Sequence, residues 1–103
     1  MNDLDWHWLT LSQACQRLKS GRSSALELTR DMLARASALA DQTRCYVHML
    51  EDDALAAAQK LDDKQAAGEP LGLLHGIPIG IKDLLFTRGL PTASGTMVMQ
   101  DFC

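Results

Sequence analysis

The segment 76–83, Gly-Ile-Pro-Ile-Gly-Ile-Lys-Asp, constrains the fold more than any other part of the chain. Side chains alternate along an extended strand, so its three isoleucines fall on one face, and Pro78, Gly80 and Lys82 fall on the other. Gly80 leaves room for a backbone or a substrate to approach beside Lys82. The pattern predicts a strand with one apolar face and a single ammonium on the opposite face, which is typical of a site.

The residues alone leave three interpretations of Lys82. Its ammonium can reach solvent along the aliphatic stem, or pair with Asp83 or another carboxylate. A phosphate-binding loop is disfavoured, because Gly76 and Gly80 lack the required spacing and Asp83 follows the lysine where that loop has Ser or Thr. The third is a desolvated amine that acts as a base. A lysine base at neutral pH needs a pKa of about 7 instead of about 10.4, which costs about 4 kcal/mol, and the segment permits this without requiring it.

Three helices are predicted by apolar residues at helical spacing. They are expected at about 10–21, 24–40 and 52–67. The first two begin with a capping box, in which a Ser or Thr is followed three residues later by Glu or Gln. These pairs are Thr10 with Gln13, and Ser24 with Glu27. Gly21 and Gly68 supply the stop signals of the first and third helices.

Several other features have an ordinary structural interpretation. Residues 44–50 alternate with period two, which predicts a strand that is partly covered on both faces. His48 is predicted to be packed or hydrogen-bonded rather than a ligand, because no second ligand lies at a useful spacing. Trp6 and Trp8 are expected to pack on neighbouring structure, with a ligand platform as the alternative. The polar run 62–64 predicts a solvated helix face.

Composition bounds the class of protein. The 103 residues suffice for one small domain or a piece of a larger one, and 47% apolar with 22% charged residues permits a core. The formal charge of −3 without a basic cluster predicts no direct nucleic-acid partner.

The cysteine pattern and the start of the chain bear on location. Cys15, Cys45 and Cys103 are odd in number and widely spaced, which predicts reduced thiols, no disulfide framework, no zinc site and a cytoplasmic protein. The start of the chain carries Asp3 and Asp5 where an export signal would have basic residues, so we expect no export. No apolar run is long enough to span a membrane, so we expect no membrane insertion. A turn-rich piece, 87–96, and an apolar tail, 97–103, end the chain without a stop signal, which indicates an element that has been cut off.

Residues 74–83, followed by 89–92 and Gly95, closely resemble the start of the amidase signature family. The preceding helices and the 44–50 strand are similar to that family in order and spacing. The resemblance implies an α/β fold in which a mixed sheet is surrounded by helices. Residues 1–103 would be the truncated N-terminal portion of such a domain, contributing about three helices, one or two strands and a turn-rich segment.

The same resemblance implies a chemistry. The family hydrolyses amide C–N bonds with a serine nucleophile, a second serine in a cis peptide linkage and a lysine, and it needs no metal or other cofactor. Lys82 matches the lysine and is the one catalytic residue carried over to this chain. Both serines would lie further along than the sequence reaches, and Ser94 lacks the glycine- and serine-rich setting to replace them. The isolated 103-residue chain is therefore expected to be inactive.

Three functions stay open. The preferred one is an amidase that acts on a small carboxamide, because that is the broader class. The alternatives are the glutaminase subunit of a tRNA-dependent amidotransferase, and a non-catalytic truncated module that binds a partner through an open sheet edge. The resemblance implies a small-molecule amide substrate for the full-length enzyme and leaves open a homo-oligomer or a partner subunit.

Overall fold

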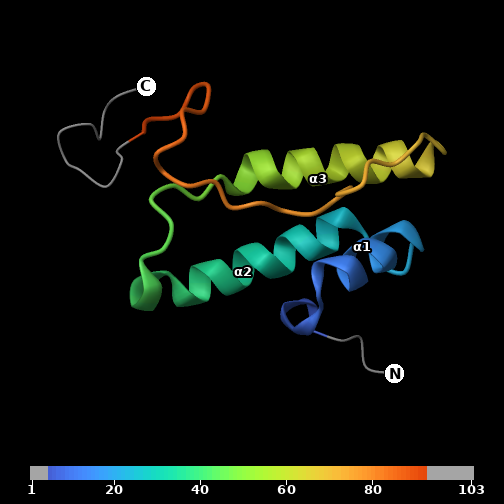
Figure 1. Cartoon of the computed structure of the whole chain (residues 1–103), viewed down its shortest axis with the longest axis horizontal. Coiled ribbons are helices and arrows are strands. Elements are labelled where there is room, and N and C mark those ends of the chain that lie inside the picture. The colour runs from blue at the N-terminus through green and yellow to red at the C-terminus, as the bar shows by residue number, and fades with distance from the viewer. Residues whose placement is uncertain (1–4, 93–103) are drawn as a thin grey trace.

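A computed structural model describes residues 5–92 of the chain. Ser94, Gly95 and the apolar tail 97–103 lie outside the described residues. The elements are a 3-10 turn η1 (Trp6–Trp8) and the helices α1 (Leu11–Lys19), α2 (Ala25–Thr43) and α3 (Glu51–Ala66). Figure 1 shows α2 and α3 lying side by side and antiparallel, with α1 beside the N-terminal end of α2.

The predicted helix starts are confirmed, because both capping boxes form. The Gln13 N–H donates to Thr10 Oγ1 at 3.2 Å, and the Thr10 N–H donates back to the Gln13 side chain at 2.9 Å. The Glu27 N–H donates to Ser24 Oγ at 3.0 Å, and the Ser24 N–H donates to Glu27 Oε2 at 3.2 Å. Each cap satisfies amides that have no partner inside the helix, which stabilises the helix by about 1 kcal/mol.

The helix ends differ in how well the sequence predicts them. The α1 end and the α3 end lie beside Gly21 and Gly68, whose φ angles are 77° and 75°, as the stop signals predict. Helix α2 continues to Thr43, three residues beyond the expected end, and closes with Arg44 in the left-handed conformation at φ 45° and ψ 35°. Glycine is the usual signal for a helix end of this kind, and Arg44 does not give that signal. The predicted α2 was therefore too short.

A small core lies where η1, α1 and α2 meet. Its buried members are Trp6, Ala14, Leu18 and Leu28, and Leu9, Met32 and Ile77 pack against them. The Arg17 guanidinium stacks over the Trp6 ring at 4.4 Å and its Nε donates to Ser23 Oγ at 2.9 Å. The packing expected of the tryptophan pair is therefore confirmed for Trp6 and wrong for Trp8, which is 79% exposed.

The predicted strands are not present in the described part of the chain, so the mixed sheet is not seen there. Residues 44–50 and 76–83 belong to no strand or helix. A strand is held by hydrogen bonds from a neighbouring strand, and neither segment has such a neighbour within residues 5–92. The expected covering of 44–50 is also wrong, because Tyr46 and Val47 are 51% and 63% exposed and His48 lies exposed instead of packed.

The helices give no membrane span. Across residues 5–92, none of them combines the length and the apolar character needed to cross a bilayer.

Candidate functional site

Lys82 lies at the end of a connection that leaves α3 and runs back along α2 and α3 (Figure 1). Its side chain is exposed, and the neighbouring isoleucines Ile79 and Ile81 are also 68% and 61% exposed. Directly after it the chain turns, because the Leu85 N–H donates to the Lys82 carbonyl at 3.0 Å. The described residues do not supply the desolvation that a base would need, and the catalytic assignment of Lys82 stays a prediction from the resemblance.

The start of this connection is fixed against the corner between α1 and α2. Gly76 has a φ of 79°, and a Cβ placed on it would lie 3.0 Å from the Ala25 Cβ and 3.2 Å from Leu18 Cδ1. A side chain at this position would therefore collide with the corner, and only glycine fits without strain. His75 beside it is buried, and Ile77 packs against the core. The connection thus begins from a defined point on the helices.

The corner itself is held by α3, through a contact that the sequence analysis missed. The Asp62 carboxylate accepts the Ala25 N–H at 2.8 Å and the Leu26 N–H at 3.0 Å, so it caps the N-terminus of α2 from a different helix. Gln65 Nε2 donates to the Leu18 carbonyl at 2.9 Å, near the end of α1. The predicted solvated face is wrong for Asp62, which is half-buried, and right for Asp63 and Lys64, which are exposed.

One signal for Asp62 was present in the sequence. Acidic side chains are unfavourable near the C-terminus of a helix, where the macrodipole is negative. Asp62 and Asp63 lie in the C-terminal part of α3 all the same. The positive N-terminal end of a neighbouring helix compensates for this placement, and antiparallel packing of α2 and α3 brings that end close.

The ring of Tyr46 lies beside the connection close to Lys82. A Cβ placed on Gly80 would lie 3.7 Å from Tyr46 Oη and 3.8 Å from Tyr46 Cε1. The group beside Gly80 is therefore the Tyr46 ring from the loop between α2 and α3, at a distance that leaves room for a Cβ, and the approach of a backbone or a substrate expected at Gly80 stays a prediction.

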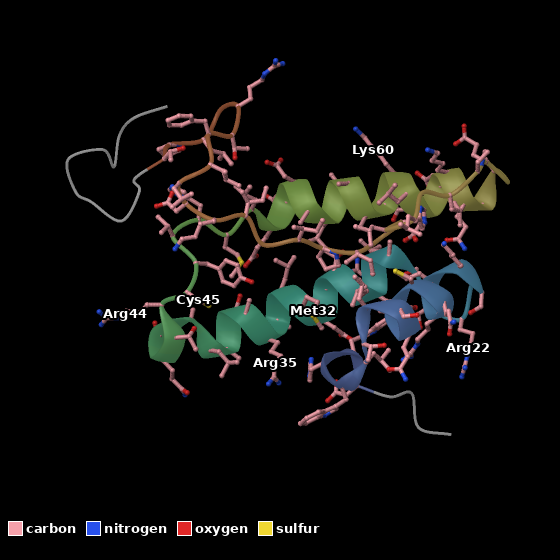
Figure 2. All side chains as sticks on the ribbon, viewed as in Figure 1. Arg22, Met32, Arg35, Arg44, Cys45 and Lys60 are labelled. Atoms are coloured by element: carbon pink, nitrogen blue, oxygen red, sulfur yellow. The ribbon has the colours of Figure 1, made fainter. Side chains whose placement is uncertain are left out.

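An open depression on another side of α2 is separate from Lys82. It is lined by Asp5, His7, Asp31, Ala34, Arg35, Ala38 and Leu39. Figure 2 shows the Arg35 side chain pointing away from α3. The structure does not bring Lys82 to this depression, and its charged side chains are of both signs, so it has no evident part in amide chemistry.

Side chains of the kinds that can bind a metal ion are present in the described region. Among residues 5–92, no three His, Cys, Asp or Glu side chains gather in a way that could hold a metal ion. Cys15 and Cys45 are free thiols. The cytoplasmic location inferred from the cysteine pattern stays a prediction.

Comparison with known proteins identifies relatives over both the segment 76–83 and the helices that precede it. The family model "Amidase" matches residues 27–103, roughly three quarters of the chain. The A-type subunit of the glutamyl-tRNA(Gln) amidotransferase from Chloroflexus aggregans is 43% identical over 96 residues, covering 93% of this chain and 20% of that protein. The same subunit from Salinispora tropica is 44% identical over 80% of this chain and 17% of that protein. The same subunit from Microcystis aeruginosa is 42% identical over 90% of this chain and 19% of that protein.

A solved structure has a similar fold. The matching chain was described with an unexpected vestigial protein complex that reveals the evolutionary origins of an s-triazine catabolic enzyme. It superposes with a TM-score of 0.87 at 26% identity, over 91% of this chain and 21% of that one. The chain spans about one fifth of the length of these relatives. With the family model matched across the segment 76–83 and most of the helix α2, the chain belongs to the amidase family.

Proposed function

We propose that this chain is the N-terminal segment of an enzyme that cleaves a carboxamide C–N bond, and that Lys82 is its general base. The observation that carries the proposal is the position of Lys82, in a family-matched region and at the end of a connection that is fixed at Gly76 and passes the Tyr46 ring at Gly80. Precise placement of a base relative to the reacting group is a large part of its catalytic effect.

The proposed reaction is acyl transfer through a covalent intermediate. A serine oxygen from a later part of the protein attacks the amide carbonyl, and its proton passes through a second serine, in a cis peptide linkage, to the Lys82 amine. The proton is then delivered to the leaving nitrogen as the C–N bond breaks, and ammonia departs. Water then hydrolyses the acyl-enzyme, which frees the serine and releases the carboxylic acid, and the ammonia is either released or passed to an acceptor. This chain contributes the lysine, so the 103 residues alone are inactive.

The relatives favour one substrate class within this chemistry. Three of them are A-type subunits of glutamyl-tRNA(Gln) amidotransferases, at 42% to 44% identity. This reverses the preference drawn from the sequence, and we propose that the full-length protein takes ammonia from the side-chain amide of glutamine. Because these relatives are named as subunits, they also support a partner subunit for this protein.

An amidase acting on a small carboxamide is the second candidate. It is supported by the structural likeness to a chain described with the origins of an s-triazine catabolic enzyme. The two candidates differ in whether activity needs partner subunits.

The test is ammonia release by the native gene product, in wild-type form and as Lys82→Ala, with glutamine and with a small carboxamide as substrates. Lys60→Ala is the matched control, because Lys60 lies on α3 and points away from α2 (Figure 2). Loss of a general base lowers the rate by about 10²- to 10⁴-fold. We expect that loss in Lys82→Ala and wild-type rates in Lys60→Ala.

Two outcomes distinguish the candidates, and a third would overturn the proposal. Glutamine-dependent amidation of misacylated tRNA together with a co-purifying subunit supports the amidotransferase, and hydrolysis of the small carboxamide without a partner supports the amidase. Wild-type ammonia release by Lys82→Ala would exclude the proposed role of this lysine.

A further inference from the structure

Tyr46 lies in the loop between α2 and α3, and its ring lies beside Gly80. A Cβ placed on Gly80 would lie 3.7 Å from Oη and 3.8 Å from Cε1 of Tyr46, which is van der Waals distance. The ring thus occupies the direction in which a side chain at position 80 would point. Two segments far apart in the sequence meet at this contact.

The contact lies close to Lys82 along the chain. Gly80 precedes Lys82 by two residues, so a shift of the backbone at Gly80 also shifts the backbone that carries Lys82. The connection has an earlier fixed point at Gly76, where it lies against Ala25 and Leu18. Of the two fixed points, the Tyr46 contact is the one nearer to the lysine.

We propose that Tyr46 is a positioning residue for Lys82, and that its ring sets the path of the backbone that carries this lysine. The proposal rests on the proposed function, because it assigns to Tyr46 a role that acts through the Lys82 base. Tyr46 acts by the bulk of its ring, since the ring edge and the attached oxygen are the atoms that lie beside Gly80. The space beside position 80 admits a Cβ at van der Waals distance from the ring and leaves little room for a larger side chain.

This role predicts a specific pattern of kinetic effects. A misplacement of about 1 Å can cost about 10²-fold in rate. We expect Tyr46→Phe to keep wild-type kinetics, because the ring remains. We expect Tyr46→Ala to lower kcat by about 10- to 100-fold with little change in KM, because the base moves while substrate contacts stay.

A double-mutant cycle tests the contact with Gly80 itself. Gly80→Val places a branched side chain where the ring lies, so it displaces either the ring or the connection. In the Tyr46→Ala background that space is empty, so Gly80→Val should do less harm there. The fold-decrease in kcat that it causes should be at least about five times smaller in Tyr46→Ala than in the wild type. Residues in direct contact show such non-additive effects, and independent residues do not.

The experiment uses the native gene product and steady-state ammonia release, with Val47→Ala as the matched control. Val47 is the next residue in the same loop and is 63% exposed, so its truncation should leave kcat unchanged. Thermal unfolding of every variant checks that it is folded. If Tyr46→Ala does not fold, Tyr46→Leu provides the same comparison, because it removes the ring and keeps part of the bulk.

Lys82→Ala, measured in the same series, separates the two hypotheses. If it keeps the wild-type rate, the proposed function fails. If it loses activity while Tyr46→Ala or Tyr46→Leu keeps the wild-type kcat, the proposed role of Tyr46 is overturned and the function stands. Simple additivity of the Gly80→Val and Tyr46→Ala effects would also overturn it.

Discussion

Gly76 is where the connection that carries Lys82 meets the helices. Its φ of 79° lies in the left-handed region, which glycine adopts more readily than any residue with a Cβ. A Cβ at this position would also lie only 3.0 Å from the Ala25 Cβ. Both restrictions act on the same residue, so a larger residue would have to change the backbone and push the corner apart.

We predict that Gly76→Ala lowers the free energy of unfolding by about 1–3 kcal/mol, from the left-handed conformation and the close contact together. Urea unfolding of the chain measures the effect. Gly72→Ala is the control, because a Cβ at Gly72 meets nothing within 4 Å. Equal stability of the two variants would show that the Gly76 contact does not constrain the chain.

Among the elements, α3 joins the other two helices at one corner. Its Asp62 caps the first turn of α2 and its Gln65 binds the last turn of α1. Ser24 satisfies the Glu27 amide, and Asp62 satisfies the amides of Ala25 and Leu26. These three amides of the first turn therefore all have an acceptor, supplied by the capping serine or by α3.

We predict that Asp62→Asn destabilises the chain by about 1–2 kcal/mol, because hydrogen bonds to a charged acceptor are stronger than those to a neutral one. Hydrogen exchange of the Ala25 and Leu26 amides should become faster in this variant. Asp63→Asn is the control, since its carboxylate is exposed and accepts a bond from Gln59 within α3. Unchanged exchange at both amides in Asp62→Asn would argue against the interhelix cap.

The helices could be predicted from the sequence, and their contacts could not. A capping box such as Thr10 with Gln13 is a local signal, because both partners lie within one turn. Asp62 and Ala25 are joined only when α2 and α3 pack, so their pairing has no local pattern. The strand predictions were wrong for the same reason, because a strand forms only when a second strand pairs with it. The position of the Tyr46 ring beside Gly80 was likewise not predictable, because the two residues lie far apart in the sequence.

Across the molecule as a whole, the connection leaves many large apolar side chains in solvent. Exposed fractions of 46% to 81% belong to Leu73, Leu74, Ile79, Ile81, Leu84, Leu85 and Phe86. Soluble monomers rarely expose so much apolar surface along one segment. This surface is available for contact with further protein.

We predict that the isolated 103-residue chain self-associates at micromolar concentration, measured by light scattering. Ile79→Ser and Leu73→Ser should each weaken the association, because they remove exposed apolar surface from the connection. Trp8→Ser is the control, since this 79% exposed side chain lies in η1, outside the connection. A wild-type chain that stays monomeric would contradict the prediction.

The proposed role of Lys82 requires a protein much larger than this chain. The decisive experiment is to measure the intact mass of the native gene product, captured from its source cells with an antibody against the N-terminus. The chain of 11.3 kDa spans 20% of its Chloroflexus aggregans relative, so we predict a product about five-fold heavier. A native product of 11.3 kDa would contradict the proposal, because Lys82 would then have no serine nucleophile to serve.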